Sequence, residues 1–154
     1  MRRADRRTNA TPPPRTAARR SRPRWPSPPA IAGLLVLLVL PALAVHRLAS
    51  VIDWRGLLAA LLLLSGVAFL AYWDDKRRAE GGAWRVAEST LHALGLLGGW
   101  PGGFLAQHCL RHKTSKRSFQ VVFWLIVLIH QAAALDALGG WRWSREILRV
   151  VESL

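Results

Sequence analysis

Three long apolar runs constrain this chain more than any other feature of its sequence. They cover residues 30–48, 57–73 and 119–138, and the middle run contains no charged residue. A helix needs about 20 apolar residues to cross a hydrocarbon layer about 30 Å thick, so each run spans or nearly spans a membrane. The sequence therefore predicts an all-α membrane protein with three transmembrane helices.

The 28 residues before the first span have a very different composition. They contain nine arginines and six prolines, and Trp25 is their one aromatic residue. Such a segment buries too little apolar surface to offset the entropy that is lost when it becomes ordered. We therefore expect a disordered basic tail over residues 1–28, followed by a helical membrane domain over residues 29–138.

The first apolar run also fits a second interpretation. An arginine-rich start, an apolar core, and Ala42 and Ala44 in an A-x-A arrangement are typical of a cleaved secretory signal. However, a basic region of about thirty residues is long for such a signal, and the run continues far enough to form a transmembrane helix. We therefore favour a span that is retained.

The segment 91–110, LHALGLLGGWPGGFLAQHCL, is apolar too, but glycine and proline interrupt its middle. Gly-Gly favours the end of a helix and proline favours the first turn of the next, so GLLGG followed by WPGG fits two helices with a break. On one continuous helix, in contrast, Gly95, Gly99 and Gly103 would form a smooth face that allows close association with another helix, including one from a second chain. The segment is thus either a helical hairpin or a fourth span.

The distribution of lysine and arginine orients the chain but does not choose between these two alternatives. A hairpin would place 17 of the 22 basic residues on one side of the membrane, and a fourth span would place 16 there. Because cytoplasmic loops carry the excess of positive charge, both arrangements put the N-terminus and residues 74–90 in the cytoplasm. We expect a multi-pass protein of the cytoplasmic membrane.

The last residues, 139–154, predict an amphipathic helix. Its apolar stripe consists of Ile147, Leu148, Val151 and Leu154. Its charged residues lie off that stripe and are Arg142, Arg145, Arg149 and Glu152. Such a helix either lies in the headgroup region of the membrane or packs its stripe against a neighbouring helix.

Two polar clusters flank the glycine-rich segment, DKRRAEGGAWRVAE before it and RHKTSKRSF after it. With LLGGWPGG between them, these motifs resemble, in order and spacing, a family of small bacterial membrane proteins known as domain of unknown function 1294. The resemblance covers roughly residues 57–135. The matching positions are Asp75, Lys76, Ala79, Trp84, Arg85, Glu88, Gly98, Gly99, Gly102, His112, Lys113, Thr114, Lys116 and Phe119.

The chain departs from the family pattern at two positions. Ala87 stands where members usually carry proline before the glutamate, and Ser115 stands where a basic residue usually follows the threonine. The missing proline weakens one helix-start signal. Members often carry a cold-shock domain ahead of the membrane part, but the tail here is too short for that fold. Since the family has no established activity, the resemblance implies an architecture rather than a reaction.

The polar clusters supply the candidate binding residues, most of them cationic and all near predicted membrane ends. They are Asp75, Lys76, Arg85, Glu88, His112, Lys113 and Lys116. A cation beside an anionic leaflet gains about 1 kcal/mol, so the pattern favours binding of anionic lipid headgroups, with Arg85, His112 or Lys113 in contact. Alternatively, the two acids pair with Arg85 and Lys113 and stabilise the helical bundle.

Metal binding has weak support. The spacing of Glu88 to His92, and of His108 to His112, places each pair on one face of a helix. No HExxH, paired CxxC or phosphate-binding glycine loop is present, and Cys109 is the single cysteine. The sequence therefore predicts no bound metal and no cofactor.

Three classes of function fit this pattern. The first is a small integral membrane protein whose cytoplasmic charged cluster, residues 74–90 and 111–119, binds anionic lipid or stabilises the bundle. The second is a membrane-embedded enzyme that acts on a lipid or another small substrate, although no residue pair identifies a reaction. The third is a tether in which the arginine-rich tail contacts nucleic acid non-specifically, or contacts another partner. The charge pattern favours binding over catalysis.

Overall fold

The computed structural model describes residues 25–111, 113–114 and 116–153 of the 154-residue chain. Most of the expected tail, together with His112, Ser115 and Leu154, therefore lies outside the described residues. The part of the chain that is described is helical and contains no strand. Its elements are α1 (Pro28–Leu48), α2 (Trp54–Glu80), α3 (Glu88–Leu94), the π-helical turn η1 (Gly95–Gly99), α4 (Trp100–Leu110), α5 (Arg117–Leu138) and α6 (Arg142–Glu152).

Helices α1, α2 and α5 are long and apolar enough to cross a membrane, which confirms the three predicted runs. Helix α2 extends beyond its apolar run at both ends. The Asp53 side chain accepts a hydrogen bond from the Arg55 N–H at its start, and Gly81 and Gly82 end it. Gly82 has a φ of +67°, a conformation that glycine adopts without steric cost. The helix therefore carries its charged last turns past its own apolar run.

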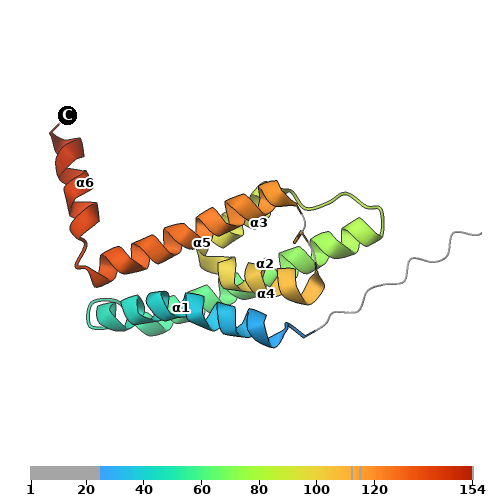
Figure 1. Cartoon of the computed structure of the whole chain (residues 1–154), viewed down its shortest axis with the longest axis horizontal. Coiled ribbons are helices and arrows are strands. Elements are labelled where there is room, and N and C mark those ends of the chain that lie inside the picture. Colours follow the sequence, from blue (N-terminus) through green and yellow to red (C-terminus); the bar gives the residue numbers. More distant parts are fainter. Residues whose placement is uncertain (1–24, 112, 115, 154) are drawn as a thin grey trace, which may run out of the picture.

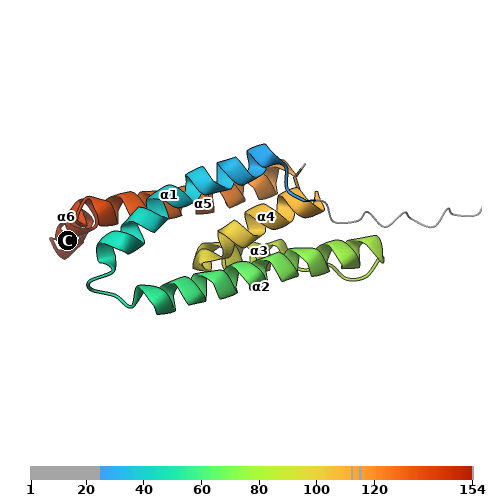
Figure 2. The same ribbon diagram turned by 90° about the horizontal axis from the view of Figure 1, so that it is seen from below.

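Between α2 and α5 the chain forms a hairpin rather than a fourth span. Gly98 lies inside η1 with a φ of +108°, and Pro101 then occupies the first turn of α4. Helix α3 leads into this turn and α4 leads out of it, so the two helices lie on the same side of the turn, toward one end of the bundle (Figures 1 and 2). The structure thus contains the hairpin alternative, because the glycine reverses the chain where a straight helix would have continued.

Glycines let the hairpin approach α2 closely. A Cβ atom at Gly102 would lie 1.8 Å from the Ser65 carbonyl oxygen, and one at Gly99 would lie 2.8 Å from the Leu64 carbonyl oxygen. Gly95 and Gly103 are also buried against neighbouring side chains of the same chain. The glycine series therefore serves packing within one molecule. Association of two chains through Gly95, Gly99 and Gly103 stays a prediction.

The main core lies where the hairpin meets α2 and α5. Large buried side chains there include Tyr72, Leu91, Trp100, Phe119 and Phe123. Many of the remaining leucines and valines of the three long helices are exposed, for example Leu62 and Leu63 on α2. Exposed apolar surface on this scale indicates contact with lipid or with another protein.

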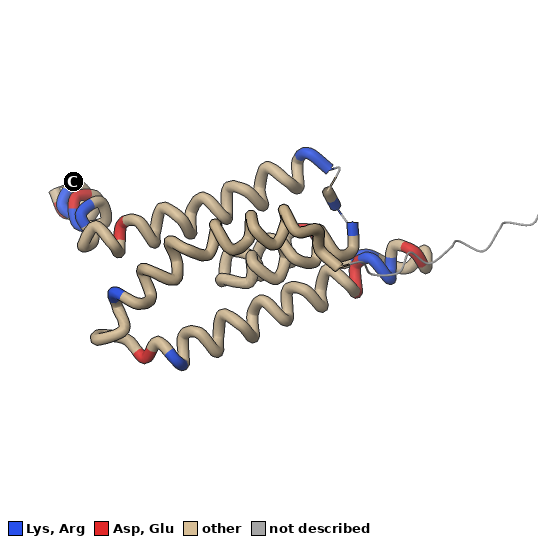
Figure 3. The backbone as a smooth tube through the Cα atoms, turned by 60° about the horizontal axis from the view of Figure 1, so that its bottom comes forward, with Lys and Arg blue, Asp and Glu red and all other residues tan. Residues whose placement is uncertain are grey.

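The two ends of the bundle differ (Figures 1 and 3). The last turns of α2, the α2–α3 loop, the α4–α5 loop and the first turn of α5 gather at one end, which we call the charged end. Helix α6 lies at the other end and runs across the direction of α5 (Figure 1). No described residue of α6 is buried, and its apolar stripe, including Ile147 and Leu148, is exposed. Its location in the headgroup region stays a prediction.

Candidate functional site

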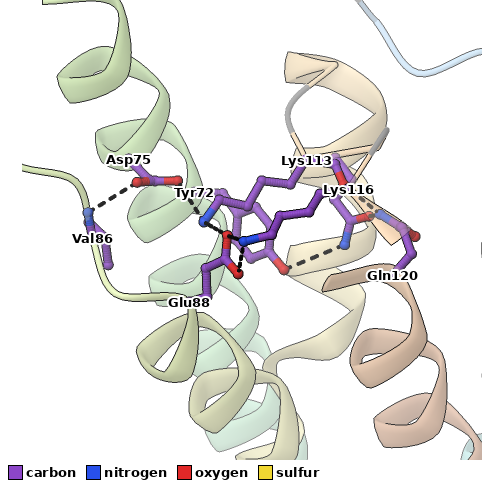
Figure 4. Close-up of polar contacts among 8 residues, drawn as sticks. Tyr72, Asp75, Val86, Glu88, Lys113, Lys116 and Gln120 are labelled. Atoms are coloured by element: carbon purple, nitrogen blue, oxygen red, sulfur yellow. Dashed lines mark hydrogen bonds and ion pairs between the residues drawn. The ribbon is translucent and has the colours of Figure 1, made fainter. Parts of the chain in front are cut away.

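Asp75 is the centre of the polar cluster at the charged end (Figure 4). Its side chain is fully buried, although it lies in the charged last turns of α2. One carboxylate oxygen accepts the Val86 N–H at 3.0 Å, which ties the α2–α3 loop back onto α2. The other lies 3.1 Å from the Lys113 ammonium. A buried carboxylate thus has both a backbone donor and a cation.

Lys113 and Lys116 reach across the hairpin to Glu88, the first residue of α3 (Figure 4). The Lys113 ammonium lies 3.4 Å from Glu88 as well as beside Asp75, and only 9% of its side chain is exposed. The Lys116 ammonium donates to both Glu88 oxygens, at 2.9 and 2.8 Å. The two lysines therefore hold the start of α3 against the chain that follows α4.

The electrostatics of Glu88 follow from this contact. The hydrogen bond from Lys116 lowers the pKa of Glu88 below its ordinary value of 4.5, and the charge of Lys113 acts in the same direction. Partial burial opposes the shift. Glu88 is therefore a carboxylate at neutral pH and carries the charge that pairs with Lys116.

The loop after α4 has the backbone conformation that this arrangement requires. Arg111 and Lys113 have φ values of 48° and 60°, in the left-handed region that non-glycine residues seldom adopt. The Lys76 ammonium donates to the Leu110 carbonyl at 2.8 Å, and the Gln120 amide donates to the Lys113 carbonyl at 2.9 Å. These bonds hold the loop so that Lys113 points inward.

Three polar residues of this network were not predicted from the sequence. The Gln120 amide donates to the Gln107 oxygen at 2.6 Å, and the Gln107 amide lies 3.4 Å from the Tyr72 hydroxyl. Gln107 and Tyr72 are buried. A signal was available, because amides and hydroxyls inside apolar segments are costly unless they find partners. The sequence alone did not show which partners they find.

The structure divides the predicted binding residues into two groups. Asp75, Glu88, Lys113 and Lys116 come together in one network, and Lys76 caps α4 and lies 3.7 Å from Glu80. Arg85 is exposed and has no ion pair among the described residues. His112, the remaining predicted binding residue, lies outside the described residues. Both acids lie within ion-pair distance of Lys113, as one of the two interpretations expected, but Arg85 takes no part in this pairing.

Arg85 belongs to a set of exposed arginines at this end. In the described part of the chain, none of them forms an ion pair with a carboxylate. We call this set the arginine rim: Arg77, Arg85, Arg111 and Arg117. The guanidinium of Arg77 lies 5.1 Å from the centre of the Trp73 ring, an aromatic contact that does not neutralise it. The rim therefore presents net positive charge.

The two described histidines of the hairpin have separate surroundings. The His92 ring stacks on Phe119 at 4.3 Å, whereas the His108 Nδ1 lies 2.8 Å from the Phe104 carbonyl oxygen. Within the described residues, no group of three His, Cys, Asp or Glu side chains could hold a metal ion. Two of the three weak metal candidates, His92 and His108, therefore have different neighbours. The third, His112, lies outside the described residues.

Comparison with known proteins agrees with the motif at these positions. The family model described as a protein of unknown function, DUF1294, matches residues 65–119, a narrower range than the expected 57–135. The uncharacterised protein YsdA of Bacillus subtilis is 32% identical over 71 residues, which cover 46% of this chain and 80% of that relative. No solved structure matches the chain. The matched range contains the C-terminal part of α2, the whole hairpin, the first residues of α5 and every member of the ion-pair network. With this match and this relative, the chain belongs to the DUF1294 family.

Proposed function

We propose that this protein is a small multi-pass membrane protein whose charged end faces the cytoplasm and binds anionic lipid headgroups through the arginine rim. In this proposal the carboxylates of the same end do not bind a ligand. They hold the hairpin in the bundle, so that the loops bearing the arginines stay at the level of the headgroups.

The proposal rests on one observation: the acids of the polar cluster pair with lysines, whereas the rim arginines form no ion pair within the described residues. Asp75 and Glu88 are engaged by Lys113 and Lys116, which leave the core of the cluster close to neutral. Arg78, a fifth arginine of this end, pairs with Asp74. The rim arginines keep their charge and their exposure. A protein that needed only a stable bundle gains little from cations that pair with nothing.

The expected strength follows from the number of rim residues. Each cation near an anionic surface contributes about 1 kcal/mol, and this attraction falls off within a Debye length of about 8 Å at physiological ionic strength. The rim should therefore prefer anionic to zwitterionic lipid, and salt should weaken this preference. The exposed ring of Trp84, next to Arg85, suits the membrane interface where such contacts occur.

The test uses the full chain in nanodiscs that contain equal amounts of phosphatidylglycerol and phosphatidylcholine. Replacing Arg77, Arg85 and Arg117 by Gln should lower the enrichment of phosphatidylglycerol around the protein. The matched control replaces three arginines of the N-terminal segment, Arg7, Arg15 and Arg19, by Gln, since it removes the same charge without changing the rim. Equal losses in the two variants would show that net charge alone attracts the lipid and would contradict a rim.

Orientation has its own test. Reporter fusions after residue 20 and after residue 80 should both report the cytoplasm, because the helices between them cross the membrane twice. Opposite locations would overturn the arrangement of α1 and α2 as two spans.

A further inference from the structure

An open cleft lies at the charged end between the start of α1 and the end of α4, which run close together there in both ribbon views (Figures 1 and 2). Its volume is about 670 Å³. Residues 25–28 form one wall, and Gln107, His108, Arg111 and Thr114 form the other. Arg111 thus differs from the rest of the rim, because it lines a concave site.

The polar wall of the cleft has the chemistry of an anion site. It combines a guanidinium, a hydroxyl, an amide and an imidazole, and no carboxylate lines the cleft among the described residues. Ser27 adds a hydroxyl from the opposite wall, where its side chain makes no capping bond to α1. Guanidinium groups bind phosphate oxygens through paired hydrogen bonds, and hydroxyls donate single ones.

The backbone of α1 is not the source of these donors. Pro28 and Pro29 have no N–H group, and the Ala30 N–H already bonds to the Ser27 carbonyl at 2.9 Å. An anion in the cleft would therefore depend on side chains, above all on Arg111. The left-handed backbone of Arg111 ends α4 at this point, so the side chain leaves the helix beside the cleft.

His108 is held in one orientation at the same wall. Its Nδ1 is within hydrogen-bond distance of the Phe104 carbonyl, which can only accept, so Nδ1 carries the proton. Its ring also packs on Phe104, with the ring centres 4.3 Å apart. Nε2 is then the ring nitrogen that this bond leaves available to a ligand.

The other wall is apolar. Trp25 has 94% of its surface exposed, and Pro26 and Pro28 continue the wall toward α1. The exposed face of α1 carries apolar side chains. An exposed indole beside a cation is typical of the membrane interface. We infer that this cleft binds one anionic phospholipid, with its phosphate at Arg111, Thr114 and Ser27 and its glycerol and acyl portion against residues 25–28.

This inference rests on the proposed function only in placing the charged end at an anionic leaflet. The rim attracts many lipids weakly and exchanges them, whereas the cleft holds one lipid at a defined position. The two can therefore be separated by counting lipids that remain bound after the surrounding bilayer is removed.

The experiment is native mass spectrometry of the full chain released from nanodiscs of equal phosphatidylglycerol and phosphatidylcholine. We expect one retained phosphatidylglycerol on the unmodified protein. Loss of the paired, charge-assisted bonds in Arg111→Gln should lower its occupancy about 10-fold. Arg47→Gln is the matched control, because it removes the same charge from an exposed arginine at the end of α1, outside both the rim and the cleft, and should leave the occupancy within about 2-fold.

Thr114→Val and Ser27→Ala extend the test without changing charge. Each should lower the occupancy several-fold, an effect that general electrostatics does not produce. These two variants also test the site if Arg111→Gln fails to fold. A thermal unfolding measurement shows whether Arg111→Gln is folded. Equal occupancy in these two variants and the unmodified protein would overturn the inference.

Other outcomes separate the alternatives. Equal losses in Arg111→Gln and in Arg85→Gln, a variant of the rim outside the cleft, would show rim attraction only. Retention of phosphatidylcholine to the same extent would contradict a site for an anionic phospholipid, because the choline cation of that lipid balances its phosphate. Displacement of the lipid by millimolar inorganic phosphate would identify a site for soluble phosphate. A retained lipid that depends on Arg111, without general enrichment of phosphatidylglycerol, would support the cleft and contradict the rim.

Discussion

A buried aspartate near the end of an apolar helix, Asp75 at one end of the molecule and Asp136 at the other, has different partners in the two places. Each lies near the C-terminal end of an apolar helix, is largely or fully buried, and accepts N–H groups from the chain that follows. Asp75 binds the Val86 N–H, eleven residues on. Asp136 binds the N–H groups of Trp143 and Ser144, seven and eight residues on.

The difference lies in the remaining partner. Asp75 also pairs with Lys113, which comes from beyond the hairpin and is itself almost buried. Asp136 instead accepts the Ser144 hydroxyl, so its side-chain hydrogen bonds within the described residues all come from the first turn of α6. Asp75 therefore stabilises the tertiary fold, because its counter-charge is distant in sequence. With its local partners, Asp136 sets the direction of one helix.

The largest expected effect comes from breaking the distant pair. Lys113→Met should lower the free energy of unfolding by about 3–5 kcal/mol, because Asp75 would remain buried without this cation. Unfolding in detergent, followed by tryptophan fluorescence, measures the change. The exposed Lys116→Met should cost less than about 1 kcal/mol.

The double variant Asp75→Asn/Lys113→Met makes this prediction sharper. Removing both charges should recover most of the stability that the single variant loses, since the penalty arises from the uncompensated charge. A double variant no more stable than Lys113→Met would mean that lost packing, and not the buried charge, explains the effect.

A somewhat smaller effect is expected from separating the hairpin from α2. Gly102→Ala places a methyl group against the Ser65 carbonyl and should cost about 2–3 kcal/mol by overpacking. Gly66→Ala is the control, because no other atom lies within 4 Å of the added Cβ and alanine favours the helix. Thermal unfolding of both variants measures the contrast, and similar losses would contradict close contact of the two backbones.

At the other end, Asp136→Ala should cost about 1 kcal/mol, the typical value of a lost helix cap, and should act on α6 alone. Hydrogen exchange of the amides of residues 142–152 should become about 10-fold faster while the amides of α2 stay protected. Glu146→Ala, which removes only an exposed pair with Arg149, should leave exchange unchanged. Loss of protection in α2 would show that Asp136 supports the whole bundle.

The smallest effect concerns pH. Because the pKa of Glu88 is lowered in the folded protein, its contribution to stability is fully present above about pH 4.5 and is lost as the pH falls through the folded value. The unfolding free energy of the unmodified protein minus that of Glu88→Gln should be constant from pH 7 to about 5 and shrink below. Partial exposure keeps the difference under about 1 kcal/mol. A difference that grows on acidification would contradict the ion pair with Lys116.

Much of the fold follows from local sequence. Length and hydropathy predicted the three long helices, and Gly98 with Pro101 predicted the break in the hairpin, because each signal acts within a few residues. The charge counts could not choose the hairpin over a fourth span, since both placed nearly equal numbers of cations on one side. That choice depends on contact between Gly102 and Ser65, which lie far apart in the sequence.

The candidate site shows the same difference between what local sequence predicts and what depends on contacts between distant residues. Composition and spacing are enough to predict which residues belong to the polar clusters, their family motif and their place next to apolar helices. They do not predict that Lys113 turns inward to Asp75 while Arg85 stays exposed, or that Arg111 borders a cleft with residues 25–28. These contacts depend on distance and burial, which the chain acquires only after the glycine turn has folded it back.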